Sequence, residues 1–476
     1  MPSARIWTAP VKCGALQACS GLDTAQVVGN DAGMISPQPE VAQNVQGDRV
    51  AALGRRIAVK RDDLIALTQD LIRIPTLNPP GANYREICDY LARRLAGHGF
   101  VSQLIRAEGA PGDCDAAPRW NVVARREGRA GGDCVHFNSH VDVVAVGAGW
   151  TTDPFGGELR DGRIYGRGAC DMKGGLAASI IAAEAFIDEY PDFCGAIEIS
   201  GTADEETGGY GGVAYLAGRG YFDPARVQHV IIPEPLNKDR VCLGHRGGWW
   251  AEIETFGQIA HGCMPFLGDC AVRHMGAVLA AFETTLYPAL AARHTAMPVV
   301  PEGARASTMN INSIHGGQAE NPPGSTALPA HCVPDSCRIV IDRRFLVEES
   351  LDGVRGEVRD LLEGLKRSRP KFSYALRELN SVLPAMTPES APIAQTVAAA
   401  IRAVLGHDAQ FVASPGSYDQ KHIDRIGKLK NCIAYGPGIL ELAHQPDEYV
   451  GVDDMIASAE VMARSLVTLL GPRQQD

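Results

Sequence analysis

Histidines and carboxylates stand directly after short apolar stretches of this sequence. The run C-V-H-F-N-S-H-V-D ends in His140 and Asp142, and A-I-E-I-S-G-T-A-D-E-E ends in three adjacent acids, Asp204, Glu205 and Glu206. Like charges at contact distance repel strongly where the effective dielectric is low, so a buried D-E-E requires compensating cations. An exposed turn is the alternative, because runs of charge usually face water.

Three further residues extend this set. Asp171 lies in G-R-G-A-C-D-M-K-G-G before a predicted helix, Glu234 lies in V-I-I-P-E-P, and His444 lies in A-H-Q-P-D-E. Taken singly, Asp171 could cap the helix, Glu234 could occupy a turn and His444 a loop. The spacing H-x-D places Asp142 on the same side of a strand as His140, where it can orient the imidazole. Together, two histidines and several carboxylates form an N and O ligand set suited to Zn²⁺, Co²⁺ or Mn²⁺.

Strand-like and helix-like stretches alternate in the first half of the chain and would position these residues. Apolar periodicity predicts helices from Arg61 onward and over residues 84–97, 174–189 and 212–218. The strand-like runs between them are W-N-V-V-A-R, C-V-H-F-N-S-H, A-I-E-I-S-G and H-V-I-I-P-E. This alternation predicts an α/β fold with a mainly parallel sheet flanked by helices. Ligands of such sheets bind outside the carboxyl ends of the strands, where the candidate residues gather.

The pattern changes after about residue 246. W-W-A-E-I-E-T-F alternates like a half-exposed strand, and C-R-I-V-I-D-R-R-F reads as another, while residues 271–286 and 351–367 read as helices. Two strand and helix pairs predict a small α+β domain inserted into the larger one. We expect a poorly ordered N-terminal extension over residues 1–55. The larger domain, which we expect to be catalytic, comprises residues 56–245 and 382–476, and the inserted domain comprises residues 246–381.

Composition argues against several classes of function. The 56 acidic and 45 basic residues give a net charge of −11, whereas nucleic-acid binding draws on clustered Lys and Arg. Apolar stretches are too short or interrupted to span a bilayer, and the N-terminus lacks the apolar core of a secretory signal. The 13 cysteines include no C-x-x-C pair, which is typical of reduced thiols. We expect a cytoplasmic protein without membrane or nucleic-acid partners.

Five motifs, in this order, resemble those of one enzyme family. S-H-V-D, G-R-G-A-C-D-M-K-G-G, T-A-D-E-E-T-G-G, P-E-P and the late G-P-G with H-Q-P-D-E are similar to motifs of the co-catalytic di-zinc metallopeptidases and deacylases. This family includes aminoacylase, acetylornithine deacetylase, succinyl-diaminopimelate desuccinylase and bacterial glutamate carboxypeptidase. The resemblance covers residues 60–470. It implies a di-zinc exopeptidase-like catalytic domain with an inserted ferredoxin-like domain that serves as lid and dimer interface.

The resemblance also implies a metal-ligand set. Two divalent ions per chain, Zn²⁺ with Co²⁺ and Mn²⁺ as alternatives, would be bridged by Asp171. One ion would be held in addition by His140 and Glu234. The other would be held by Glu206 and His444. A separation of about 3.5 Å is usual for such two-metal sites.

Roles for the neighbouring residues follow from the same resemblance. Glu205 would be the general base that deprotonates the attacking water, because a base must gain and lose a proton whereas a ligand must stay ionised. Asp142 would support the ligands, and the peptide bond between Asp171 and Met172 would be cis. Asp204 has no implied role.

The inserted domain carries the motif G-Q-I-A-H-G-C-M-P-F-L-G. Its His261 matches a family histidine that reaches into the partner subunit's site to stabilise the oxyanion, which implies a homodimer through residues 246–381. Arg344 matches an arginine that pairs with a substrate carboxylate, with a structural salt bridge as the alternative. Asn321 falls where the family has an asparagine in contact with substrate, but N-P-P-G-S-T-A-L-P-A-H-C-V-P contains extra residues relative to the family pattern.

The implied activity is metal-dependent hydrolysis of an amide bond in a small N-acyl substrate, of the acetylornithine deacetylase or succinyl-diaminopimelate desuccinylase type. Removal of a formyl group from an aminopyrimidine is one alternative, and dipeptidase or carboxypeptidase activity on the same scaffold is another. A binding protein without catalysis is the non-enzymatic alternative. Such a protein should have lost a ligand or the base, whereas every expected position is filled.

Overall fold

The computed structural model describes residues 39–317 and 331–472. Helix α1 (Pro39–Val59) begins inside the stretch 1–55, and the predicted domain boundaries stay predictions. Residues 1–38 and Asn321, the predicted substrate contact, lie outside the described residues. From Gly47 onward the chain clusters as one compact unit.

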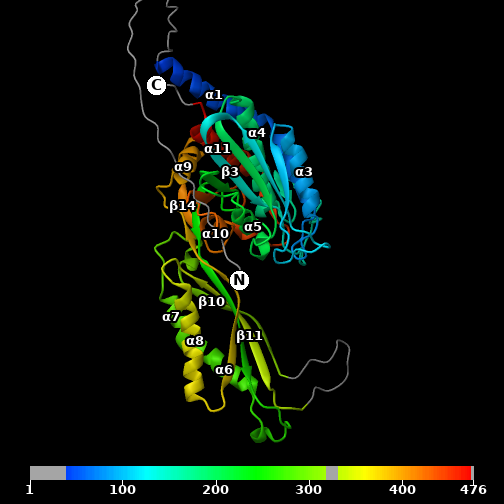
Figure 1. The fold of residues 1–476 in the computed structure, drawn as a ribbon, viewed down its shortest axis with the longest axis vertical. Helices are drawn as coiled ribbons and strands as arrows, with labels where there is room; N and C mark the ends of the chain where they lie inside the picture. Colours follow the sequence, from blue (N-terminus) through cyan, green and yellow to red (C-terminus); the bar gives the residue numbers. More distant parts are fainter. Residues whose placement is uncertain (1–38, 318–330, 473–476) are drawn as a thin grey trace, which may run out of the picture. The chain divides into compact units, whose positions relative to one another are not determined.

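The central sheet contains nine strands from the described part of the chain (Figure 1). Its middle strands β6, β3, β7 and β15 run parallel, whereas the pairs toward β1 and β13 are antiparallel. The predicted α/β fold is confirmed, with parallel pairing concentrated at the centre. In spatial order the strands are β1 (Val101–Arg106), β2 (Trp120–Glu127), β6 (Cys194–Thr202), β3 (Arg129–His140), β7 (His229–Ile232), β15 (Cys432–Ala434), β8 (Arg240–His245) and β13 (Ala385–Met386), with β14 (Gln410–Ser414) also paired to β8.

Two hydrophobic cores lie on the two faces of this sheet. In β7, Ile231 enters one core, and Val230 and Ile232 enter the other, as the two-residue period of a strand requires. Burial on both faces explains the apolar runs V-I-I of β7 and C-I-A of β15, whereas β3 and β6 also contain buried polar residues. Helices α2 (Arg61–Arg73), α3 (Tyr84–Ala96), α4 (Gly174–Glu189), α9 (Pro392–Leu405) and α11 (Val452–Leu470) contribute to the first core, and α5 (Val213–Gly218) and α10 (Gln420–Arg425) contribute to the second.

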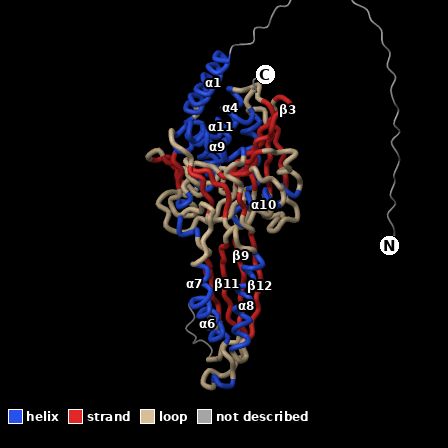
Figure 2. Tube along the Cα trace, turned by 90° about the vertical axis from the view of Figure 1, so that its left-hand side faces the viewer, coloured by secondary structure: helices blue, strands red, loops and turns tan. Residues whose placement is uncertain are grey.

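A second sheet, of four described strands, is built from residues 247–382, which we call the lid. All its pairs are antiparallel, in the order β10-β11-β9-β12, and α6 and α8 pack against it (Figure 2). The predicted strands and helices are present, whereas two strands, β10 and β12, were not predicted. The lid elements are β9 (Gly247–Phe256), α6 (Ala271–Ala281), α7 (Tyr287–Ala291), β10 (Thr308–Gly316), β11 (Ser336–Phe345), α8 (Leu351–Ser368) and β12 (Ser373–Val382).

A small three-stranded sheet joins segments that are distant in sequence. It pairs β16 (Tyr449–Gly451) with β5 (Arg163–Tyr165), and β5 with β4 (Glu158–Arg160). The loop that follows β5 and the loop that precedes β16 are therefore neighbours. In the described part of the chain, no helix has the length and apolar character needed to cross a membrane.

Candidate metal centre

Two groups of potential metal ligands among the described residues share Asp171. The first trio is His140, Asp171 and Glu234, and the second trio is Asp171, Glu206 and His444. Within each, one ligand atom per residue lies within 4.8 Å of the others. Oδ1 of Asp171 lies 3.0 Å from Nε2 of His140, and Oδ2 lies 3.5 Å from Nε2 of His444. One carboxylate therefore faces both trios.

The elements explain why these side chains meet. His140 closes β3, Glu234 follows β7, and Glu206 lies in a short helical turn after β6, so that three parallel strands deliver them to one sheet edge. Asp171 precedes α4, and its peptide bond to Met172 is cis, as predicted. A Cβ atom on Gly175 of α4 would come 1.9 Å from the carbonyl oxygen of Pro233, so glycine permits the close approach of α4 to the loop that carries Glu234.

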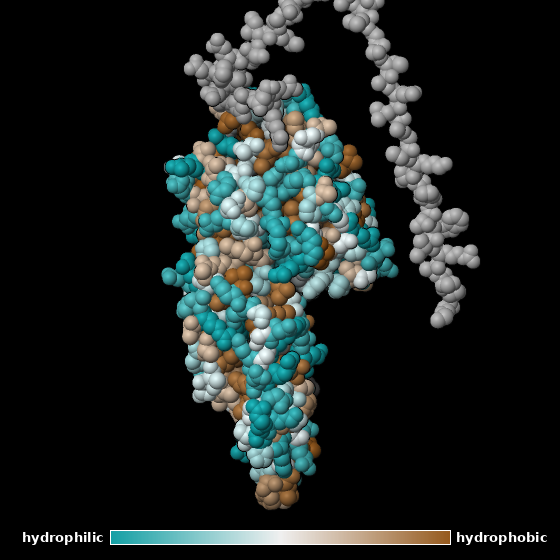
Figure 3. Space-filling model, turned by 60° about the vertical axis from the view of Figure 1, so that its left-hand side comes forward, coloured by the Kyte–Doolittle hydropathy of each residue, from teal (hydrophilic) through white to brown (hydrophobic). Residues whose placement is uncertain are grey.

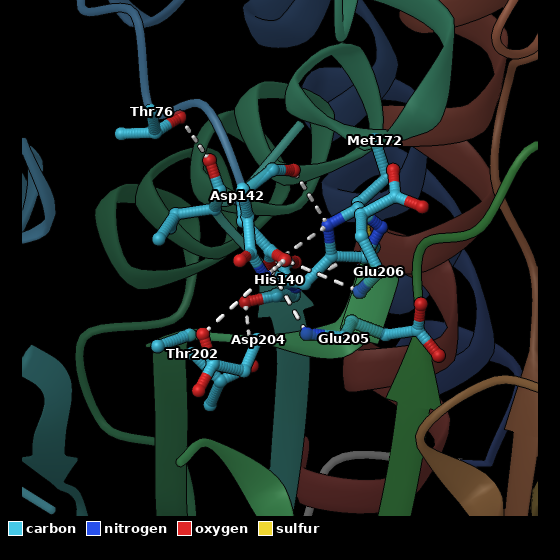
Figure 4. Close-up of polar contacts among 12 residues, drawn as sticks. Thr76, His140, Asp142, Met172, Thr202, Asp204, Glu205 and Glu206 are labelled. Atoms are coloured by element: carbon cyan, nitrogen blue, oxygen red, sulfur yellow. Dashed lines mark hydrogen bonds and ion pairs between the residues drawn. The ribbon is translucent and has the colours of Figure 1, made fainter. Parts of the chain in front are cut away.

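Asp142 positions the D-E-E segment. Its buried carboxylate accepts hydrogen bonds from the backbone N–H groups of Glu205 and Glu206, each at 3.1 Å (Figure 4). The Nδ1 atom of His140 bonds to the backbone oxygen of Asp142 at 3.0 Å and lies 3.7 Å from the carboxylate. Asp142 thus contacts the imidazole both through its main-chain oxygen, by a hydrogen bond, and through its carboxylate, at ion-pair distance. Burial raises the pKa of Asp142 to about 6.

Asp204, which had no implied role, is buried and paired. It accepts from Nε of Arg119 at 3.0 Å, from the hydroxyl of Tyr84 at 3.1 Å and from the amide of Asn78 at 3.3 Å. The exposed-turn alternative for D-E-E is therefore wrong, because the side chains of Asp204, Glu205 and Glu206 are only 3%, 11% and 7% exposed. Arg119 provides a compensating cation at Asp204. The three adjacent acids have separate surroundings, with Asp204 directed to Arg119 and Glu206 to the second trio.

Glu205 faces a lysine that the sequence reasoning missed. Nζ of Lys421, on α10, lies 2.8 Å from Oε1 of Glu205, and both side chains are largely buried. Asp419 is also buried here and accepts a hydrogen bond from Asn138 at 3.2 Å. Burial opposes the charge of Lys421, but Glu205 and Asp419 outweigh it and raise the pKa of the lysine. The available signal was S-Y-D-Q-K-H, an acid and a lysine that follow strand β14.

The charge distribution fits divalent cations. Burial raises the pKa of Glu206 to about 7, and burial together with the nearby Asp171 carboxylate raises the pKa of Glu234. Hydrogen bonds to Asp171 and Glu206 raise the pKa of His444 to about 10. Carboxylates crowded in this way repel one another, and a cation between them would relieve the repulsion. Two imidazoles and three carboxylates are a donor set that Zn²⁺, Co²⁺ and Mn²⁺ accept.

A cavity of about 540 Å³ adjoins the second trio, because Glu206 and His444 are part of its lining. Catalytic and lid residues share its lining, and the hydroxyl of Tyr210 links the D-E-E loop to Asn380 of β12 at 3.2 Å. The cavity is thus bounded by both sheets of the unit. The lining comprises Glu205, Glu206, Thr207, Gly208, Trp250, Arg344, Leu379, Asn380, Val382, Gly416, Ser417, Lys421 and His444.

Arg344 and His261, both in the lid, have different surroundings. Arg344 lines the cavity and also donates from Nε and Nη2 to Asp342, at 2.7 and 3.0 Å, while its guanidinium stacks on Trp250 at 4.6 Å. The structural salt bridge and the position beside the cavity therefore occur together. His261 is exposed in the loop after β9 and is not among the described residues that line this cavity.

Known proteins are similar to this chain in sequence and in fold. The pattern of Peptidase family M20/M25/M40 matches residues 136–468. Succinyl-diaminopimelate desuccinylase of Thioalkalivibrio sulfidiphilus is 29% identical over 430 residues, which cover 86% of this chain and 99% of the relative. The desuccinylase of Methylorubrum extorquens is 31% identical over 413 residues, covering 84% and 97%.

Solved structures support the fold. Human carnosine dipeptidase 1 superposes with a TM-score of 0.70 at 18% identity, covering 88% of this chain and 98% of that one. A dinuclear metal-binding peptidase of the M20 family from Bacillus subtilis gives 0.60 at 15% identity, covering 87% and 99%.

Fold, clustered ligands and sequence similarity together define a metal-dependent amidohydrolase of the deacylase and peptidase class. The chain belongs to Peptidase family M20/M25/M40. The predicted family resemblance, the enzyme class and the α/β fold with an inserted lid are confirmed. The similarities provide no support for the non-enzymatic alternative.

Proposed function

We propose that this protein is a two-metal deacylase acting on a small N-acyl amine that carries a carboxylate. The observation that carries the proposal is Asp171, whose two oxygens face the two trios beside a cavity lined by Glu205. The desuccinylase relatives make an N-succinyl group the first candidate for the acyl part. Arg344 lines the cavity, which favours a carboxylate on the substrate.

The metal ions would be Zn²⁺, with Co²⁺ and Mn²⁺ as alternatives. When bound, two divalent cations would activate water and polarise the amide carbonyl. His140 and Glu234 would complete one site and Glu206 and His444 the other, with Asp171 in both. The mixed N and O donors and the crowded buried carboxylates support this assignment.

Glu205 moves the proton in this proposal. Its carboxylate would accept a proton from the attacking water and deliver it to the leaving nitrogen. Lys421 holds Oε1 of Glu205 at 2.8 Å, and Asp142 holds its backbone N–H at 3.1 Å. These two contacts restrict the position of the Glu205 carboxylate. A base held in one position relative to the attacking water transfers a proton more readily.

We propose a homodimer in which His261 of each chain completes the partner's site. Two observations support this: His261 is exposed and apart from its own cavity, and its loop exposes apolar side chains, with Ile259 55% and Phe266 78% exposed. Figure 3 shows apolar residues at the lower end of the lid. Substrate contact by Asn321 and a cytoplasmic location stay predictions.

A heteroaromatic substrate is the second candidate. The indole of Trp250 lines the cavity beneath the guanidinium of Arg344, which Asp342 already engages through two nitrogens. If Arg344 stays in this pair, the stacked surface suits a flat ring such as an N-formylated aminopyrimidine.

The test is a hydrolysis panel on protein reconstituted with Zn²⁺, Co²⁺ or Mn²⁺. N-succinyl, N-acetyl and N-formyl amines and dipeptides are compared, and we expect N-succinyl or N-acetyl amino acids to react fastest. Glu205→Gln should lower turnover by roughly 10²- to 10⁴-fold while metal content stays near two per chain. Glu389→Gln, at an exposed glutamate, is the control and should behave as wild type. Full metal content without hydrolysis of any amide would overturn the proposal.

A further inference from the structure

His444 is held in an unusual backbone conformation. Its φ is 66°, in the left-handed region that non-glycine residues rarely adopt. The residue lies in an irregular segment between a short helical turn, Leu440–Leu442, and β16, and its side chain is 49% exposed. Neither a regular element nor burial of the imidazole therefore fixes this ligand. Some other contact must hold it beside Glu206 and Asp171.

Arg167 provides that contact. Its guanidinium is 2% exposed and donates from Nη2 to the carbonyl oxygen of His444 at 3.1 Å and from Nη1 to that of Gln445 at 3.2 Å. The same Nη2 also reaches the carbonyl oxygens of Ala145 and Val146, at 3.2 and 3.0 Å. Arg167 thus ties the loop of His444 to the loop that follows His140.

Glu448 connects this arginine to the shared ligand. Its Oε2 accepts from Nη1 of Arg167 at 2.6 Å, and its Oε1 accepts the backbone N–H groups of Cys170 and Asp171 at 2.9 and 3.0 Å. Glu448 is 1% exposed, and its own backbone oxygen accepts from Gly166 at 2.9 Å. One buried ion pair therefore contacts the main chain of both Asp171 and His444.

We propose that Arg167 and Glu448 are positioning residues that assemble the second trio. This inference rests on the proposed two-metal function, because it concerns how tightly the second cation is held. Among the residues of the first trio the pair contacts only Asp171 directly, whereas the carbonyl of Asp142 orients His140. Loss of the pair should therefore weaken the second site more than the first.

The test compares charge-neutral replacements of two ion pairs that each contain a fully buried carboxylate. Arg167→Met with Glu448→Gln removes the clamp without leaving a lone buried charge. Arg125→Met with Glu198→Gln removes the matched pair at β2 and β6, where Arg125 Nη1 lies 2.9 Å from Glu198. Both proteins are reconstituted with Co²⁺, and metal content, stepwise affinity by calorimetry, and folding by circular dichroism are measured.

Wild type and the control pair should bind two Co²⁺ per chain. The clamp variant should bind one tightly and the second about 10- to 100-fold more weakly, the usual effect of losing a residue that orients a metal ligand. Equal affinities in all three proteins would overturn the inference while leaving the proposed function intact. Fewer than two Co²⁺ in wild type would instead contradict the two-metal function.

A conservative variant covers the case in which the double replacement fails to fold. Arg167→Lys keeps the charge facing Glu448 but cannot reproduce the forked donation to four carbonyl oxygens. Its second Co²⁺ should bind about 10-fold more weakly. Wild-type affinity for both ions in this variant would refute the positioning role.

Discussion

Replacing Lys421 with methionine should slow catalysis without releasing metal. The ammonium lies 2.8 Å from Oε1 of Glu205 and, among the described residues, contacts neither trio within ion-pair distance. Methionine retains the length and apolar stem of lysine but offers no donor. Glu205 would then be free to leave the position at which it receives the proton. The expected loss is in kcat, with little change in KM.

The magnitude follows from the geometry of this pair. At 2.8 Å and an effective dielectric of about 20, the Coulomb attraction is about 6 kcal/mol. Desolvation of two buried charges cancels a large part of it. The net value of a hydrogen bond to a charged group is about 1.5–3 kcal/mol. If that energy holds Glu205 in place, kcat should fall by roughly 10- to 150-fold.

Steady-state kinetics on the fastest amide of the panel, with metal content measured on the same samples, test this prediction. Lys421→Arg keeps a cation and should recover part of kcat. Lys430→Met is the matched control, at an exposed lysine that pairs with Asp424 outside the cavity. A Lys421→Met protein with full metal and wild-type kcat would show that Glu205 needs no such partner. Loss of metal would show that the lysine supports the trios instead.

Two further predictions concern the dimer and acid stability. His261→Ala should lower kcat by about 10²- to 10³-fold at unchanged metal content. Mixing this variant with Glu205→Gln should restore activity, because a heterodimer of the two has one site with both an intact Glu205 and the partner's intact His261. If mixing restores no activity, His261 does not act in the partner's site. Burial alone would raise the pKa of Glu198, but contacts with His136 and Arg125 outweigh it and lower the pKa to about 2. Since the pKa of Glu198 is lower in the folded than in the unfolded chain, the ionised Glu198 stabilises the fold above about pH 4.5, and this stabilisation is lost as pH falls toward 2. The free energy of unfolding, measured by urea titration at several pH values, should therefore fall less with acid in Glu198→Gln than in wild type. Parallel curves of this free energy against pH for both proteins would refute the assignment.

Local sequence patterns predicted much of the fold and of the site. The helix over residues 174–189 has the same bounds in the structure, and those over 84–97 and 351–367 differ by one residue. His140 and Glu234 could be proposed as ligands because each follows an apolar strand. Such signals are local, since they depend on periodicity and on what lies at the end of a run.

Residues whose roles depend on sheet order could not be predicted in this way. Asp419 and Lys421 follow β14, and nothing in the sequence states that this segment meets Asn138 of β3 and Glu205 after β6. Arg167 and Glu448 resemble ordinary loop charges until β5 and β16 pair. The strands β10 and β12 were not predicted, although exposed and half-buried positions alternate along most of each strand. Their inward residues Met309, Ile311, Tyr374 and Leu376 are separated by exposed ones and form no continuous apolar run.

The split of the site across the lid has a consequence for biosynthesis. His140, Asp171, Glu206 and Glu234 all precede the lid in the chain, and His444 follows it. The ribosome therefore makes the acidic residues of the site first, then the whole lid, and only then His444. The second trio can be completed only then, and its closure requires pairing between segments far apart in sequence, which is slow relative to local folding. Capture of the second cation would thus mark a chain in which both the lid and the segment that carries His444 have been made.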